Sequence, residues 1–162
     1  MKVVFRWYLV EPIDPAELII KYKRVKEYLM NMTLNVQLFL CLLVLYQVKH
    51  FIGDYVLQNV WMLQKGNPDW EFLLPLSIHC GVHALMTLAI TLYLSPSLYW
   101  LAALDFFIHF AMDRIKAGPR YLGRFNDPKT KSFWVCFGID QMVHHLTHLY
   151  ICVVLAAAAV GG

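Results

Sequence analysis

Residues 105–113 read Asp105-Phe-Phe-Ile-His109-Phe-Ala-Met-Asp113, with a side chain able to bind a metal at every fourth position of an otherwise apolar run. On an α-helix, a step of four residues turns the side chain by only about 40°, so these three groups project from one face, one turn above another. Ionisable groups inside a hydrophobic helix are costly unless they find partners. The stretch therefore predicts a helix that carries one face of a buried polar site.

Other apolar segments carry imidazole or carboxylate groups at the same spacing. The patterns are His50-x3-Asp54, His79-x3-His83 and Asp140-x3-His144-x3-His148. With the first stretch, they define expected helices over residues 34–58, 71–94, 98–116 and 133–160. A helix of about 20 apolar residues can cross the roughly 30 Å of hydrocarbon in a bilayer. We therefore expect an all-α, integral membrane four-helix bundle.

The composition supports a membrane protein. Hydrophobic residues make up 59% of the 162 and charged residues 15%, whereas soluble domains average about 45–50% and about 25%. The net charge of +3 gives no reason to expect nucleic acid as a partner. The four cysteines contain no CxxC pair, so neither a disulfide framework nor a thiolate zinc site is indicated.

Residues 1–32 precede the first apolar segment and form an expected extension to a transmembrane domain over 33–162. Asp14 followed by Pro15 is typical of a helix start. From Ala16 to Met32, one side is apolar and the rest is rich in lysine and arginine. This pattern predicts a basic amphipathic helix at a membrane surface.

The polar groups have a consistent position along the four segments. They lie at the end of the first, the start of the second, the end of the third and the start of the fourth. If the crossings alternate, all of these groups fall in one leaflet, which predicts a one-sided polar site. Basic residues on the two sides number seven and six, which does not decide the orientation. If residues 1–32 are disregarded, the site faces the cytoplasm.

Three arrangements of these groups remain open: a pair of divalent metals, a single zinc, and a metal-free network of hydrogen bonds. The candidate carboxylates are Asp54, Asp105, Asp113 and Asp140, and the candidate imidazoles are His50, His79, His83, His109, His144 and His148. We favour two ions, because bridging carboxylates in helix bundles hold such pairs. A His/Asp set without thiolates suits Zn, Mn or Fe.

A family resemblance rests on His50-Phe-Ile-Gly-Asp54-Tyr-Val-Leu-Gln58, Asp105-x3-His109-x3-Asp113-x2-Lys116 and Asp140-Gln141-x2-His144. From about Leu34 to its end, the chain resembles the domain-of-unknown-function family 3307, small multi-pass membrane proteins of bacteria and their phages. That implies a bacterial inner membrane, or a host membrane for a phage protein. Members often start just before the first segment, so residues 1–32 depart from the family.

More distantly, the His/Asp arrangement is similar to that of membrane-bound proteins described as metal-dependent hydrolases. This similarity implies a set of metal ligands in the present chain. They are His50, Asp54, His79, His83, Asp105, His109, Asp113, Asp140 and His144.

The function that we expect is hydrolysis of a lipid or another membrane-embedded ester, amide or phosphoester. His148 is a candidate general base, Lys116 a candidate contact for an anionic substrate, and Gln58 a candidate for facing the substrate or supporting a ligand. One alternative is a non-enzymatic bacterial or phage membrane protein, such as a metal or proton conduit. A second is a di-iron histidine-box oxidase, for which seven histidines are few.

Overall fold

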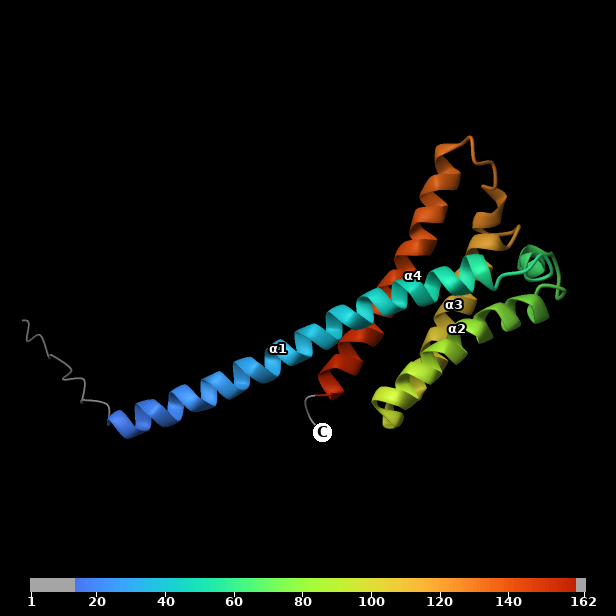
Figure 1. Cartoon of the computed structure of the whole chain (residues 1–162). Coiled ribbons are helices and arrows are strands. Elements are labelled where there is room, and N and C mark those ends of the chain that lie inside the picture. Colours follow the sequence, from blue (N-terminus) through green and yellow to red (C-terminus); the bar gives the residue numbers. More distant parts are fainter. Residues whose placement is uncertain (1–13, 160–162) are drawn as a thin grey trace, which may run out of the picture. The chain divides into compact units, whose positions relative to one another are not determined.

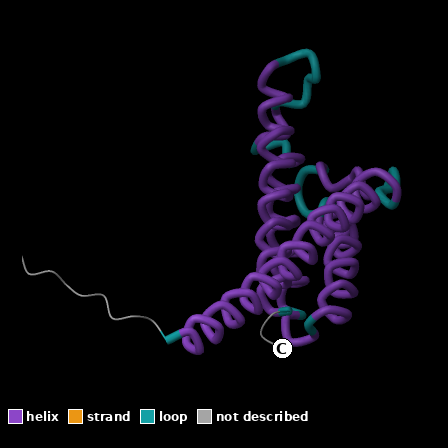
Figure 2. Tube along the Cα trace, turned by 60° about the vertical axis from the view of Figure 1, so that its left-hand side comes forward, coloured by secondary structure: helices purple, strands orange, loops and turns teal. Residues whose placement is uncertain are grey.

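The computed structural model describes residues 14–159, which form helices joined by short loops (Figure 1, Figure 2). The elements are α1 (Pro15–Phe51), η1 (Ile52–Val56), η2 (Met62–Gly66), α2 (Leu73–Leu94), η3 (Pro96–Leu98), α3 (Trp100–Ala117), η4 (Leu122–Arg124) and α4 (Lys131–Ala158). No strand occurs within the described range, so the all-α prediction is confirmed. α2, α3 and α4 begin and end within two residues of the expected segments, whereas α1 begins at Pro15 instead of residue 34 and ends at Phe51 instead of residue 58.

The chain divides into two compact units, Met1–Leu34 and Asn35–Gly162. All candidate site residues belong to the second unit. Residues 1–13 of the expected extension and Val160, the expected end of the last segment, lie outside the described residues.

α1 begins as the sequence predicts. The Asp14 Oδ1 atom accepts a hydrogen bond of 2.9 Å from the backbone N–H of Ala16, and Pro15 occupies the first helical position. This pairing is favourable because the first helical N–H groups lack partners within the helix. The expected basic helix over residues 16–32 does not end before the membrane segment. It is continuous with it in a single helix of 37 residues.

Three helical stretches are long and apolar enough to cross a membrane, namely Val36–Val56, Leu73–Leu94 and Lys131–Ala158. Their outer surfaces expose large apolar side chains, among them Val44, Leu85 and Val153. Apolar faces of this kind suit hydrocarbon better than water. The chain is therefore membrane-associated through at least these helices.

α3 is not among the candidate spans. Its 18 residues include two carboxylates, Asp105 and Asp113, and two cations, Arg114 and Lys116. Both carboxylates are buried, however, whereas Phe107 on the other side of the helix is 68% exposed. α3 packs against α2 and α4. Its charges therefore face the bundle, and its crossing of the membrane remains a prediction.

An apolar core closes one end of the second unit. Its buried members come from α1, α3 and α4, with partly buried α2 residues packed against them. They are Leu42, Tyr46, Leu101, Ile151, Cys152, Leu155 and Ala156. The candidate site lies at the other end of the same four helices.

Candidate metal centre

The local structure that presents Asp54 is a π-helical turn. After Phe51, α1 changes into η1, which holds Gly53 and Asp54. Single π-turns are rare and occur frequently at functional sites. Gly53 is buried, and a Cβ atom placed on it would overlap the imidazole of His83. The missing side chain therefore lets η1 pack directly on α2 and brings Asp54 to the histidines of that helix.

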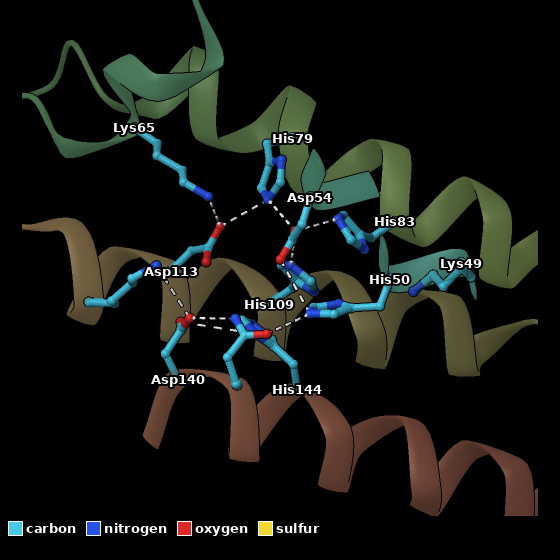
Figure 3. Close-up of polar contacts among 12 residues, drawn as sticks. Lys49, His50, Asp54, Lys65, His79, His83, His109, Asp113, Asp140 and His144 are labelled. Carbon is cyan, nitrogen blue, oxygen red and sulfur yellow. Dashed lines mark hydrogen bonds and ion pairs between the residues drawn. The ribbon is translucent and has the colours of Figure 1, made fainter. Parts of the chain in front are cut away.

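The nine predicted metal ligands lie together in one polar layer to which all four long helices contribute. Figure 3 labels all of them except Asp105. Eight of them are buried, with at most 4% of the residue surface exposed. Asp54 is the exception, with 16% of its side chain exposed. The expected convergence of residues from four segments is therefore present in the structure.

Within this layer, four groups of side chains offer ligand atoms that all lie within 4.8 Å of one another. The groups are His50–Asp54–His83–His109, His79–His109–Asp113, Asp105–His109–His148 and Asp113–Asp140–His144. Metal–ligand bonds to nitrogen and oxygen are about 2.0–2.2 Å long for zinc. Ligand atoms at these separations are thus close enough to hold one ion between them.

His109 is the centre of the layer, because it belongs to three of the four groups. Its ring centroid lies 4.0 Å from that of His83 and 3.9 Å from that of His144. Neither of its ring nitrogens has a hydrogen-bond partner among the described residues. The stretch Asp105–Asp113 therefore supplies the residue that connects α2 with α4.

Asp54 is surrounded by imidazoles. Its Oδ1 atom lies 3.1 Å from His83 Nε2, 3.4 Å from His79 Nε2 and 3.9 Å from His109 Nε2. Its Oδ2 atom lies 3.2 Å from His50 Nε2. Within the described part of the chain, histidines are its only ion-pair partners.

The other three carboxylates each face a lysine. Lys49 Nζ forms an ion pair with Asp105, Lys65 Nζ lies 2.8 Å from Asp113 Oδ2, and Lys116 Nζ lies 3.4 Å from Asp140 Oδ2. With neutral histidines, four carboxylates and three ammonium groups leave one negative charge, and it belongs to Asp54. The uncompensated charge lies where the imidazoles are most numerous.

Many polar atoms of the layer are buried without a hydrogen-bond partner among the described residues. They include Asp54 Oδ1, His79 Nε2, both ring nitrogens of His83, His109 and His144, and one oxygen each of Asp105 and Asp140. An unsatisfied buried donor or acceptor costs about 1–3 kcal/mol. Convergent lone pairs of this kind fit a divalent cation, which would bind several of them at once.

The residues predicted to take part in catalysis lie at different places. Lys116 is 30% exposed at the rim and adjoins a cavity of about 240 Å³ lined by residues that include Phe133 and Phe137. His148 is buried, and its Nε2 atom lies 3.3 Å from Lys49 Nζ. Gln58 is half-buried and belongs to none of the four groups.

Sequence reasoning missed Lys49, Lys65 and Gln141. Gln141 Oε1 lies 3.2 Å from His50 Nε2, and its side-chain nitrogen donates to Asp140 at 3.0 Å. It therefore connects two of the ligand groups. A signal for Lys49 was available, because it is a cation beside His50 in an apolar helix. Lys65 lies in the short 3-10 helix η2, and no spacing relates it to Asp113.

The comparisons with known proteins give a single family. Residues 38–160 match the family described as "Protein of unknown function (DUF3307)". The matched range takes in most of the chain and every residue of the polar layer. No curated protein and no solved structure matches the chain.

Proposed function

The chain belongs to the DUF3307 family, and from this premise we propose that it is an integral membrane protein that binds a divalent cation at His50, Asp54, His83 and His109 and uses it in hydrolysis. The observation that carries the proposal is the isolation of Asp54. It is the one carboxylate of the layer without a lysine among the described residues, and four imidazoles surround it. Three imidazoles and a carboxylate are a ligand set that zinc favours.

A metal-free network is the competing explanation, in which a protonated histidine neutralises Asp54. The geometry favours a cation instead. Three imidazole nitrogens face the same oxygen, Asp54 Oδ1, yet neither they nor that oxygen makes a hydrogen bond among the described residues. One metal ion could bind that oxygen and the facing nitrogens together, whereas one proton can bridge only a single nitrogen to the oxygen.

A second ion has a less favourable place. We call His50, Asp54, His83 and His109 the Asp54 group. Asp113, Asp140 and His144 share no residue with it, so two ions are geometrically compatible. However, Lys65 and Lys116 already neutralise the two carboxylates of this group. A second ion would have to displace both ammonium groups. We therefore propose that the Asp54 group fills first.

A divalent ion at the Asp54 group would supply a water of lowered pKa and would polarise a scissile ester or phosphoester bond. The surrounding side chains suit the other tasks of such a reaction. His79 lies 3.2 Å from Asp113 Oδ2, so this pair can hold a proton beside the site. Asp113 fits the role of general base better than His148, because Lys49 approaches Nε2 of that histidine.

The rim suggests how a substrate would approach. Lys116 borders the cavity of about 240 Å³, and its ammonium group lies 5.2 Å from the Phe137 ring centroid. An anionic headgroup could exchange with Asp140 as the partner of Lys116, while aromatic walls cover an apolar part. The substrate class that fits is an anionic membrane lipid with an ester or phosphoester bond.

The test begins with metal content. Wild type and the Asp54→Asn/His83→Asn variant are purified in detergent, exposed to Zn²⁺ or Mn²⁺, desalted and analysed by elemental mass spectrometry. We expect wild type to retain metal and the double variant to lose it. Asp69→Asn is the matched control, because Asp69 is exposed outside the site at a φ of 54°, which asparagine tolerates. Full metal retention by the double variant would contradict the assigned site.

Hydrolysis is tested separately. Metal-loaded protein is incubated with mixed anionic phospholipid vesicles, and released fatty acids and headgroups are followed by mass spectrometry. We expect products from wild type and Asp69→Asn, and none from the Asp54→Asn/His83→Asn variant. Metal retention without any lipid product would support the metal site and contradict the proposed hydrolase activity.

A conduit is the second candidate, because the buried polar groups continue along α2 from His83 to Thr87 and Thr91. Two observations oppose it. Thr91 Oγ1 donates to the carbonyl of Leu88 in its own helix, and the apolar core that includes Leu42 and Leu155 closes that end. Flux of Zn²⁺ or protons into proteoliposomes, absent from the Asp54→Asn/His83→Asn variant, would reverse this ranking.

A further inference from the structure

At the end of the polar layer nearest the apolar core, an ammonium group is enclosed within the bundle. Lys49 is only 3% exposed, and its Nζ forms an ion pair with Asp105, which is 1% exposed. Nζ also lies 3.3 Å from His148 Nε2. Thr87 donates a hydrogen bond of 2.6 Å to the same oxygen of Asp105. Every polar neighbour of this ammonium is itself buried.

The partners of Lys49 are also a metal-capable set. Asp105 and His148 form one of the four ligand groups together with His109. The ammonium therefore contacts two of the three groups that would hold a divalent ion. An ammonium group is only a donor, so the His148 tautomer that pairs with it presents a lone pair at Nε2. Metal ions bind the same lone pair of a neutral imidazole.

We propose that Asp105, His109 and His148 form a second divalent-cation site, which the tethered ammonium of Lys49 fills in place of a metal. This inference rests on the proposed function in that the Asp54 group is the resident metal site. Lys49 is a positioning residue, because it acts through Asp105 and His148. While Lys49 occupies this place, a metal ion from solution can bind only at the Asp54 group.

Unpartnered atoms support a site at this place. Among the described residues, neither Asp105 Oδ1 nor either ring nitrogen of His109 has a hydrogen-bond partner. Asp105 Oδ1 lies 3.6 Å from His148 Nε2. Both His109 and His148 are 1% exposed. The donor atoms are thus buried, convergent and incompletely satisfied by the lysine alone.

The other two lysines differ from Lys49 in their exposure. The side chains of Lys65 and Lys116 are 12% and 30% exposed, so they can leave their carboxylates for solvent. Lys49 has no such route, because it is 3% exposed and its ammonium group lies between Asp105 of α3 and His148 of α4. Of the three lysines, only Lys49 is a permanently enclosed cation, and it lies at the group formed by Asp105, His109 and His148.

The decisive test is a gain of metal binding. The Asp54→Asn/His83→Asn variant lacks two ligands of the resident site and keeps all three of the second. Adding Lys49→Met removes the internal cation at similar side-chain length. We expect the triple variant to recover a single ion per chain from Co²⁺ or Zn²⁺, where the double variant retains none. The visible absorption of Co²⁺ should differ from that of wild type, because the ligand set has fewer imidazoles.

A fourth substitution supplies the control. Asp105→Asn in the triple variant removes the carboxylate of the second site and should abolish the recovered binding. A folded triple variant that stays free of Co²⁺ and Zn²⁺ would overturn the inference. That result leaves the proposed function intact, because the resident site is judged from the double variant alone.

A second measurement holds if the triple variant does not fold. Lys49→Met alone leaves the Asp105 charge buried without its ammonium, and Lys49→Met/Asp105→Asn removes both charges. Because His109 belongs to both groups, an ion held by Asp105 and His148 competes with one held by Asp54 for this imidazole. We therefore expect the visible absorption of bound Co²⁺ to differ from that of wild type in the first variant and not in the second. Equal responses of the two variants would count against the second site.

Discussion

Asp54 and Asp105 are chemically identical side chains, and they differ in the groups that surround them. Asp105 has the ammonium of Lys49, whereas Asp54 has only imidazoles among the described residues. Removing one partner of a buried ion pair typically costs about 3–5 kcal/mol, because a charge remains buried alone. Asp54 lacks such a cation, and its Oδ1 atom is buried without a hydrogen-bond partner among the described residues, although 16% of its side chain is exposed. Its surroundings therefore favour metal uptake at this residue.

Gly53 gives the first prediction, at the scale of a residue. Gly53→Ala would force the new methyl group against the His83 imidazole. We expect metal affinity to fall by about 10–100-fold, as for changes that displace a ligand without removing it. Isothermal titration with Zn²⁺ in detergent measures the change.

Gly81→Ala is the matched control, because a Cβ at Gly81 in α2 meets nothing within 4 Å. Alanine is the better helix former by roughly 1 kcal/mol, so this variant should bind metal normally and unfold no more easily than wild type. Equal affinities of Gly53→Ala and wild type would show that His83 can move without loss of the site.

Sequence patterns were sufficient to find the candidate residues but not their grouping. Spacing of four placed Asp105, His109 and Asp113 on one helix face, and the structure places all three in the polar layer. The pairing of Lys65 with Asp113 depends on how the short helix η2 packs against α3. No local periodicity encodes such a contact, so it could not be predicted.

At the scale of elements, η1 explains why helical periodicity alone misplaces the end of the first segment. The expected helix over residues 34–58 would continue regularly, whereas Ile52–Val56 form a π-turn, in which each hydrogen bond spans one residue more than in an α-helix. The His50–Asp54 spacing was correctly interpreted as one face. The direction of Asp54 toward α2 was not predictable, because it depends on the turn and on Gly53.

The second prediction concerns the first unit. All candidate ligands lie in Asn35–Gly162, and the family match begins at residue 38. A chain that starts at Met32 should therefore retain the metal content of the full chain. Elemental analysis after purification in the same detergent measures this. A shortened chain that remains helical by circular dichroism but binds no metal would show that the first unit supports the site.

For the molecule as a whole, a metal ion that binds only the folded protein should raise the free energy of unfolding. A ligand that binds only the folded state at about 100 times its Kd stabilises by about 2.7 kcal/mol. The third prediction is that a chelator lowers the thermal transition of wild type and that Zn²⁺ restores it. The Asp54→Asn/His83→Asn variant should respond to neither. A transition of wild type that ignores chelator and Zn²⁺ would argue for the metal-free network.

The fourth prediction is the direction of the pH dependence. Three of the proposed ligands are imidazoles, which must be neutral to bind a metal. Acidification adds protons to them, so metal affinity should fall once the pH drops below their pKa values. Where more than one of them takes up a proton, the fall is steeper than the about tenfold per pH unit of a single imidazole. Competition with a chromophoric chelator between roughly pH 8 and 5 measures the slope. An affinity that stays constant through the pH at which these imidazoles take up protons in the metal-free protein would exclude histidine ligands.

The apolar core that includes Leu42, Leu101 and Leu155 closes one end of the four helices. Ions could then enter and leave through a single membrane face only. In proteoliposomes of mixed insertion, a membrane-impermeant chelator added outside should strip only the molecules whose polar end points outward, until detergent exposes the rest. The metal content of the protein would then depend on the metal concentration in one compartment and not on that in the other.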